Sequence, residues 1–153
     1  MDAITMLKTD HDELKQLLKR LEATSASNGG AKTREQLFAT IKGELTVHEI
    51  IEEEIFYPEL KAHPKAKDMV LEGYEEHHVV DEIMTELEDT PVDDETWGAK
   101  ASVMKENLEH HIEEEEGEMF DTARSVFDKA ELEDLGARME ARKVEAKREL
   151  NIP

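Results

Sequence analysis

Apolar residues recur every three or four positions along most of the chain, which is the spacing of one face of an amphipathic helix. Breaker residues divide this pattern: a Ser/Asn/Gly-rich segment at 25–30, and prolines at positions 64 and 91. No stretch alternates apolar and polar residues as a half-buried strand would. We therefore predict five helices, over residues 2–24, 33–61, 67–89, 95–125 and 129–149.

Polar residues at the expected helix starts support these bounds. Thr33, with Gln36 three residues later, has the pattern of a capping box, and Asp128 precedes the last helix. Asp93 or Asp94 is expected to cap the fourth helix.

Four long helices joined by short loops favour antiparallel neighbours. The predicted fold is therefore all-α, an up-down-up-down four-helix bundle over about residues 2–125. An additional short C-terminal helix, over about residues 129–149, should cover one end or flank of it. We expect the whole chain, residues 1–153, to form a single domain.

A histidine interrupts each of the four apolar stripes near its centre. A glutamate follows the second and the fourth of these histidines by one helical turn, on the same face. The six positions are His11, His48, Glu52, His77, His111 and Glu115.

An internal repeat relates these positions to one another. The segment around His77 matches the segment around His11 at a shift of 66 residues, and the His111 segment matches the His48 segment at a shift of 63. The chain therefore reads as one helix pair used twice. At about 1.5 Å per residue, the two histidines of each pair lie at nearly the same distance from the loop that joins their helices. Antiparallel packing should thus bring four imidazoles and two carboxylates into one layer of the core.

Such a layer favours a metal ion. Burying ionised carboxylates costs several kcal/mol unless they are paired or coordinate a metal, and no lysine or arginine lies on these stripes at that level. Imidazole and carboxylate together suit iron, manganese or zinc, and a helical bundle with ligands at one-turn spacing can hold two metal ions.

Single features of this pattern carry less weight than the whole. A lone histidine on an apolar face is usually an ordinary core residue, whereas four at matched heights with two carboxylates in register favour a site. His78 with Glu82, and His110 with Glu114, have the same spacing, and we expect both pairs to face solvent. In the run 113–116 only Glu115 is expected to turn inward.

Composition excludes several other functions. The chain has 39 acidic and 19 basic residues, a net charge of −20, which disfavours nucleic acid and anionic membranes as partners. The absence of cysteine excludes disulfides, thiol nucleophiles and cysteine-ligated clusters. The first residues lack the pattern of a signal peptide, and no apolar run is long enough to span a membrane, so we expect a cytoplasmic protein.

The pattern His11, His48-x-x-x-Glu52, His77, His111-x-x-x-Glu115 resembles the hemerythrin-like (HHE, cation-binding) family over about residues 2–125. This resemblance implies a non-haem di-iron centre at these six residues. The expected cofactor is two iron ions, oxo- or hydroxo-bridged, ahead of manganese or zinc, and the expected small-molecule partner is dioxygen or peroxide.

The chain departs from the oxygen-carrying members of that family at two points. They have a second histidine where this chain has Gly73, and a longer-spaced aspartate where it has Glu115. We expect either a more open metal position or an extra phenolate ligand from Tyr74, on the same face. Tyr57 and Glu49 are further residues near the ligands, and Glu49 is expected at the surface.

Three functions remain open at this point. The leading one is a di-iron protein that binds dioxygen or a related small oxidant for storage, sensing or scavenging. The second is a di-iron enzyme that consumes peroxide, or an iron-handling protein. The third, an acidic interaction module with a vestigial site, is disfavoured because the ligand positions carry no apolar substitutions. Whether the chain is an enzyme, its protein partner and its oligomeric state are not decided by the sequence.

Overall fold

The computed structural model describes residues 1–153, and its regular structure is entirely helical. Two of the long helices contain a π-helical turn, and a short 3₁₀ turn precedes a third. The elements are α1 (Ala3–Glu22), α2 (Gly30–Ile51), the π-helix η1 (Glu52–Phe56), α3 (Tyr57–Lys61), the 3₁₀ turn η2 (Pro64–Ala66), α4 (Lys67–Glu88), α5 (Trp97–Glu114), the π-helix η3 (Glu115–Met119), α6 (Phe120–Val126) and α7 (Lys129–Glu149). The prediction of an all-α chain is confirmed.

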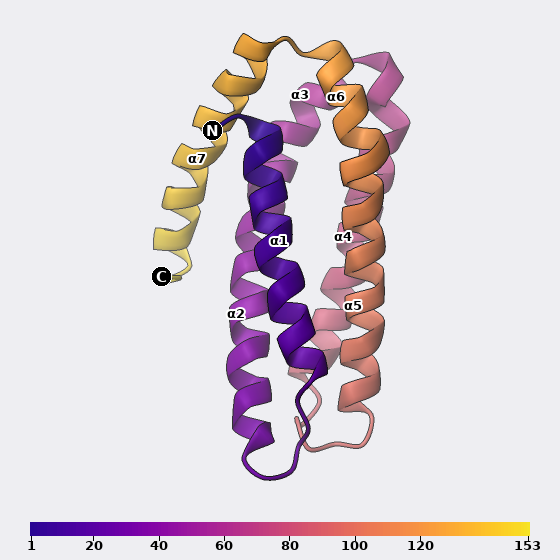
Figure 1. The fold of residues 1–153 in the computed structure, drawn as a ribbon, viewed down its shortest axis with the longest axis vertical. Helices are drawn as coiled ribbons and strands as arrows, with labels where there is room; N and C mark the ends of the chain where they lie inside the picture. The colour runs from indigo at the N-terminus through magenta and orange to yellow at the C-terminus, as the bar shows by residue number, and fades with distance from the viewer.

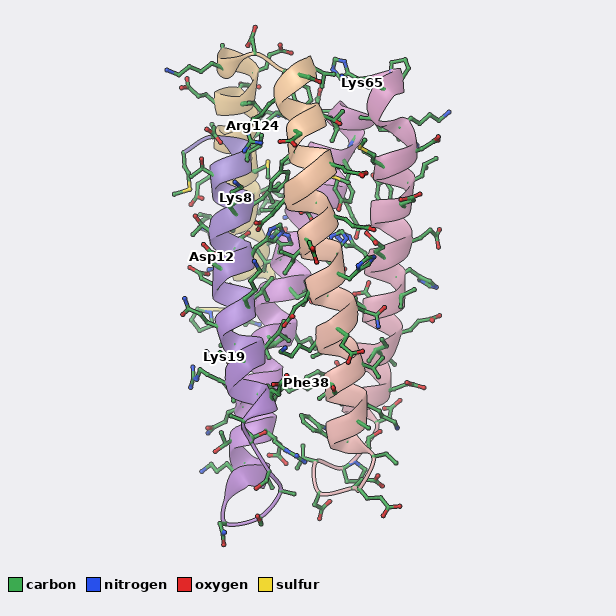
Figure 2. The ribbon with its side chains drawn as sticks, turned by 45° about the vertical axis from the view of Figure 1, so that its right-hand side comes forward. Lys8, Asp12, Lys19, Phe38, Lys65 and Arg124 are labelled. Atoms are coloured by element: carbon green, nitrogen blue, oxygen red, sulfur yellow. The ribbon has the colours of Figure 1, made fainter.

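The long helices lie side by side with alternating direction (Figure 1). α1 and α4 run one way, and the continuous segments α2–η1–α3 and α5–η3–α6 run the other way. Contacts are made between α1 and α2, between α4 and α5, and between α1 and α5. This arrangement follows from the amphipathic pattern: on α1 the labelled Lys8, Asp12 and Lys19 point away from the bundle (Figure 2), and Leu14 and Leu18 on the same helix are buried.

The last helix has the predicted bounds, residues 129–149, but its description as short is wrong. α7 has 21 residues, one more than α1, so it is not a short helix. It lies along the outside of α1 and α2, where Leu135 and Met139 are buried, and it also contacts η1 (Figure 1). α7 therefore covers one flank of the bundle.

The apolar core is divided into two clusters. One, around Leu7, Phe56 and Phe120, lies toward the end of the bundle where α6 turns into α7. The other, around Leu18 and Trp97, lies toward the loops that join α1 to α2 and α4 to α5. On α1, α2 and α4 the histidine lies in sequence between residues of the two clusters, so apolar side chains enclose the polar layer on both sides.

The helix starts show which capping predictions hold. Asp128 caps α7, as predicted, and it also forms a capping box with Glu131. The predicted capping box at Thr33 is wrong, because α2 already begins at Gly30, after Gly29 adopts a left-handed conformation with φ of 82°. A side chain at Gly30 would overlap the backbone of Ser25, so the turn requires glycine there.

The fourth helix starts at Trp97, two residues later than predicted. The Asp94 carboxylate accepts a hydrogen bond from the backbone N–H of Thr96, the residue that precedes the helix, at 2.8 Å. None of the helices combines the length and the hydropathy that crossing a membrane requires.

Candidate metal centre

Six side chains from four helical segments converge in the middle of the bundle. The histidines come from α1, α2, α4 and α5, and the two glutamates are the first residues of the two π-helices. All six are buried, with at most 3% of each residue exposed. The structure thus brings together the residues predicted from the sequence: His11, His48, Glu52, His77, His111 and Glu115.

The inward ring nitrogens of the histidines face the two carboxylates. Each Nε2 atom lies 3.0 to 3.2 Å from a glutamate oxygen, and each glutamate faces one histidine of its own segment and one of another helix. The pairs are His11 with Glu115, His48 with Glu52, His77 with Glu52, and His111 with Glu115.

The outward ring nitrogens are held by a second set of carboxylates. Every Nδ1–H donates to an acidic side chain at 2.7 to 2.9 Å. The acceptors are Glu116 for His11, Asp10 for His48, Glu53 for His77 and Glu76 for His111. This arrangement aims each Nε2 at the centre, and metal-bound histidines are typically oriented in the same way.

The sequence analysis missed these four outer carboxylates, although the repeat contains the signal. Asp10 and Glu76 each precede a repeat histidine by one residue, and Glu53 and Glu116 occupy matching positions after the ligand glutamates. Glu116 is half-turned inward by its bond to His11, so the expectation that Glu115 alone turns inward in its run is incomplete.

Both ligand glutamates begin a π-helix. η1 starts at Glu52 and η3 at Glu115, so each π-turn follows its histidine by the same number of residues. A π-helix is wider than an α-helix and occurs mostly as a single turn, frequently at functional sites. Here consecutive glutamates, Glu115 and Glu116, reach the two ring nitrogens of one histidine, His11.

Several polar atoms of this layer have no hydrogen-bond partner although they are fully buried. They are the Nε2 atoms of His11, His48 and His111, together with Glu52 Oε2 and Glu115 Oε1. An unsatisfied buried polar atom costs about 1–3 kcal/mol, so five in one layer are unusual in a core that has no ligand to bind. No lysine or arginine is paired with either glutamate. The donor set therefore fits bound cations.

The donor atoms fall into two groups that each fit one ion. His11, His48, Glu52 and Glu115 offer atoms within 4.8 Å of one another, and so do Glu52, His77 and His111. Glu52 belongs to both groups. A carboxylate has two oxygens, so one residue can serve two neighbouring ions.

The carboxylates raise the pKa values of three of the rings, those of His48, His77 and His111. Burial lowers the pKa of His48, but Glu52 and Asp10 raise it more, to about 10. Burial also lowers the pKa of His77, and Glu52 and Glu53 raise it to about 9. Burial raises the pKa of Glu115, but His111, Glu52 and His11 together outweigh burial and hold it well below its usual value. Metal ions must therefore displace protons from these rings.

Tyr57, not Tyr74, fills the space beside Gly73. A Cβ atom at Gly73 would lie 2.9 Å from the hydroxyl oxygen of Tyr57. That hydroxyl donates to Glu115 Oε2 at 2.6 Å and lies 3.4 Å from His77 Nε2. The hydroxyl of Tyr74 instead donates to the backbone oxygen of Glu53 at 3.3 Å. The structure thus contradicts the idea that Tyr74 fills the gap.

Two further expectations have different outcomes. Glu49 is buried, with Oε2 3.6 Å from His77 Nδ1, so its expected surface position is wrong. Burial raises the pKa of Glu49 to about 9. His78 with Glu82, and His110 with Glu114, are exposed ion pairs, as predicted.

A helical bundle with a buried layer of histidines and carboxylates is typical of proteins that bind cations in the core of the bundle. The chain belongs to the hemerythrin HHE cation binding domain family, whose sequence profile matches residues 2–123.

Relatives of similar length support this assignment. The chain is 32% identical over 146 residues to Rv2633c of Mycobacterium tuberculosis (strain ATCC 25618 / H37Rv), an uncharacterised protein, and to the uncharacterised Mb2666c of Mycobacterium bovis. Each match spans 93% of this chain and 85% of the relative. A crystal structure of an HHE cation binding domain-containing protein from Mycobacterium kansasii, a homolog of Rv2633c, is also similar. It has a TM-score of 0.86 and 29% identity, over 97% of this chain and 89% of that one.

Proposed function

We propose that the six-residue layer holds two iron ions and that the protein binds dioxygen or a related small oxidant there, for storage, sensing or scavenging. One observation carries the proposal: four imidazole Nε2 atoms and two carboxylates converge in a buried layer in which five of their polar atoms make no hydrogen bond. Family membership supports a cation at this position, and the resemblance to the oxygen-carrying hemerythrins supports iron.

The residues have separate tasks in this proposal. His11, His48, Glu52 and Glu115 would hold one ion, and Glu52, His77 and His111 the other. Two irons bound there would supply the electron transfer that chemistry with a small oxidant requires. The outer carboxylates orient the rings, and the apolar clusters on both sides keep bulk water away.

Tyr57 favours a second candidate, an enzyme that consumes peroxide. Its hydroxyl lies inside the layer, against Glu115. Burial and the Glu115 carboxylate hold its pKa well above the usual value, so the phenol stays protonated and remains an O–H donor. Reduction of peroxide to two waters takes up two protons and two electrons, and in disproportionation a second peroxide supplies these electrons and leaves as dioxygen. Breaking the O–O bond requires a proton at the departing oxygen, whereas reversible carriage of dioxygen breaks no O–O bond, so a proton donor at this position supports turnover.

The test is the metal content of the purified protein, together with its optical spectrum before and after anaerobic reduction and exposure to air. About two irons per chain, with a spectrum that changes reversibly with oxygen pressure, would support the dioxygen binder. Two irons that reoxidise irreversibly, in a protein that turns over added hydrogen peroxide, would support the enzyme. Zinc alone, or no metal, would contradict both.

A further inference from the structure

A small cavity leads from the surface toward the histidine layer between α4 and the segment α5–η3. Its volume is about 40 Å³, which is enough for a water molecule or an ion. His111 and Glu115 form its inner wall, and Glu72, Glu114 and Glu118 line its outer part. No lysine or arginine lines this cavity.

The inner wall points to a ligand independently of this acidic rim. His111 is 2% exposed and Glu115 1%, and both carry a buried atom without a hydrogen-bond partner: Nε2 of His111 and Oε1 of Glu115. The cavity therefore connects solvent to two donor atoms that make no hydrogen bond and that face only other residues of the layer: His111 Nε2 lies 3.2 Å from Glu115, and Glu115 Oε1 lies 3.0 Å from His11.

The mouth of the cavity carries a second donor group. Atoms of Glu76, His110 and Glu114 lie within 4.8 Å of one another, close enough to share one ion. Glu76 also accepts the hydrogen bond from Nδ1 of His111, so it belongs both to this group and to the support of the centre. The path from the mouth to the inner wall thus has carboxylates along its length.

The internal repeat shows that this polar mouth is specific to one half of the bundle. Shifted by the repeat, Glu72 corresponds to Met6, His110 to Val47 and Glu114 to Ile51. The three apolar counterparts are buried, with 3%, 1% and 0% exposure.

In the half of the bundle that α7 covers, the outer carboxylate has a basic partner. Asp10, the counterpart of Glu76, accepts from Nζ of Lys143 on α7 at 2.7 Å. Exposure alone explains why the uncovered half carries polar residues there. It does not explain why four glutamates besides Glu115 line the cavity and no lysine or arginine does.

We propose that this cavity is the route by which a divalent cation reaches the centre, and that Glu76, His110 and Glu114 hold the cation at its mouth on the way in. The proposal rests on the metal centre proposed above. Acidic clefts with low-dielectric walls focus the field and raise the local concentration and the association rate of cations. The mouth offers three donors at the surface, so it binds weakly and passes the ion on to the buried set.

The test is the rate at which metal-free protein takes up Co²⁺, followed by stopped-flow visible absorption at low ionic strength. The route variant E72Q/E114Q/E118Q removes three charges along the cavity and leaves the ligands in place. A matched control, E35Q/E86Q/E106Q, removes three charges from exposed glutamates that form no ion pair and line no part of the cavity. The single variant Glu114→Ile gives the mouth an isoleucine, which is the residue at the equivalent position, Ile51, in the other half.

We expect the route variant to take up Co²⁺ about tenfold more slowly than the wild type, with the same final number of ions per chain. The matched control should stay within about twofold, because the general field of the protein changes equally in both. Glu114→Ile should also slow uptake, and it keeps the test decisive if the triple variant does not fold.

Two results would overturn the route: uptake by the route variant at the wild-type rate, or equal slowing in both triple variants. The end point is separate from the rate. A wild-type protein that binds no Co²⁺ at equilibrium would refute the metal centre, and the route would be refuted with it.

Discussion

The two halves of the bundle carry equivalent site residues but differ in what covers them. In the first half, α1 with α2–η1–α3, the outer carboxylate Asp10 is buried under α7 and paired with Lys143. In the second half, α4 with α5–η3–α6, the equivalent Glu76 is half-buried and lines a cavity that reaches the surface. Both halves thus supply metal-ligand candidates, but the cavity that reaches them from the surface lies in the second half. One flank is closed by packing, and the other is left for exchange with solvent.

The halves also differ beside the inward ring nitrogens. Tyr57 stacks on His77 with ring centroids 5.4 Å apart, and its repeat counterpart Phe120 stacks on His11 at 5.9 Å. Only the tyrosine brings a hydroxyl, and Gly73 leaves room for it where the first half has the buried Leu7. The difference between Tyr57 and its counterpart Phe120 therefore places an O–H group beside His77 and an apolar ring beside His11.

The largest expected difference between the halves concerns the two ligand glutamates. Glu52 belongs to both candidate ion positions and Glu115 to one. Glu52→Gln should therefore abolish binding of both ions, and Glu115→Gln should retain about one per chain, with a loss of affinity above about 100-fold at the other position. Metal analysis after dialysis against Co²⁺ measures this, and equal stoichiometry in both variants would contradict the asymmetry.

A smaller effect should separate the two outer carboxylates. Asp10→Asn and Glu76→Gln should each weaken Co²⁺ binding about 10- to 100-fold, because each removes the partner that orients a ligand histidine. Burial raises the pKa of Asp10, but His48 and Lys143 hold it below its usual value, so its charge also stabilises the fold. Burial raises the pKa of Glu76, and His111 holds it below its usual value, so both variants should lower the stability of the metal-free protein. The loss should be larger in Asp10→Asn, because Asp10 is more buried and also pairs with Lys143.

Competition titration and urea unfolding measure the two quantities in these variants. Asp12→Asn is the control, since Asp12 points away from the bundle (Figure 2). A loss of stability in Glu76→Gln as large as that in Asp10→Asn would remove the distinction between the halves.

The ion pair between Lys143 of α7 and Asp10 of the first half should make a measurable contribution to the free energy of unfolding. Lys143→Met leaves the buried Asp10 without its ammonium partner and should lower the free energy of unfolding by about 2 kcal/mol, less than for a fully buried pair. Lys8→Met, on the exposed face of α1, should change it by no more than about 0.5 kcal/mol (Figure 2). Equal urea midpoints for the two variants would show that this ion pair does not stabilise the flank.

The smallest expected effect is that of the O–H group of Tyr57. Tyr57→Phe removes a hydrogen bond to a carboxylate and should cost about 1.5 kcal/mol, with a change in the optical spectrum of the iron-loaded protein. Tyr74→Phe removes only a 3.3 Å bond to a backbone oxygen and should leave that spectrum unchanged. A spectral change in Tyr74→Phe, and none in Tyr57→Phe, would instead support Tyr74 as the phenolate ligand predicted from the sequence.

The sequence was sufficient to predict the layer because its signals are periodic. His11 lies on the same stripe as Leu7, Leu14 and Leu18, and all four are buried on α1. The nearly equal shifts of the repeat then placed the histidines at one height. Helical period and antiparallel packing are general rules, so they hold without knowledge of individual contacts.

The details that depend on packing between distant segments could not be predicted in this way. Tyr57 and Tyr74 were both near the site in sequence, and only the contact of Tyr57 with Gly73 of another helix decides which hydroxyl reaches it. Lys143 lies on the last helix, whose placement is set by tertiary contacts. Neither π-turn has a propensity signal that distinguishes it from the α-helix on either side.

The two π-turns set how many residues separate each ligand glutamate from the buried aromatic residue that follows it. A π-turn holds one more residue than the α-turn it replaces, and each one lies between a ligand glutamate and a buried aromatic, Tyr57 or Phe120. The wider turn accommodates the extra residue, so the helix after it keeps nearly the orientation that it would have after a regular α-turn. Deleting one residue there would therefore restore a regular α-helix and leave Tyr57 or Phe120 close to its place. An extra residue in regular α-helical geometry would instead rotate everything beyond it by about 100°. The π-turns thus change the placement of the glutamates without moving the core that follows them.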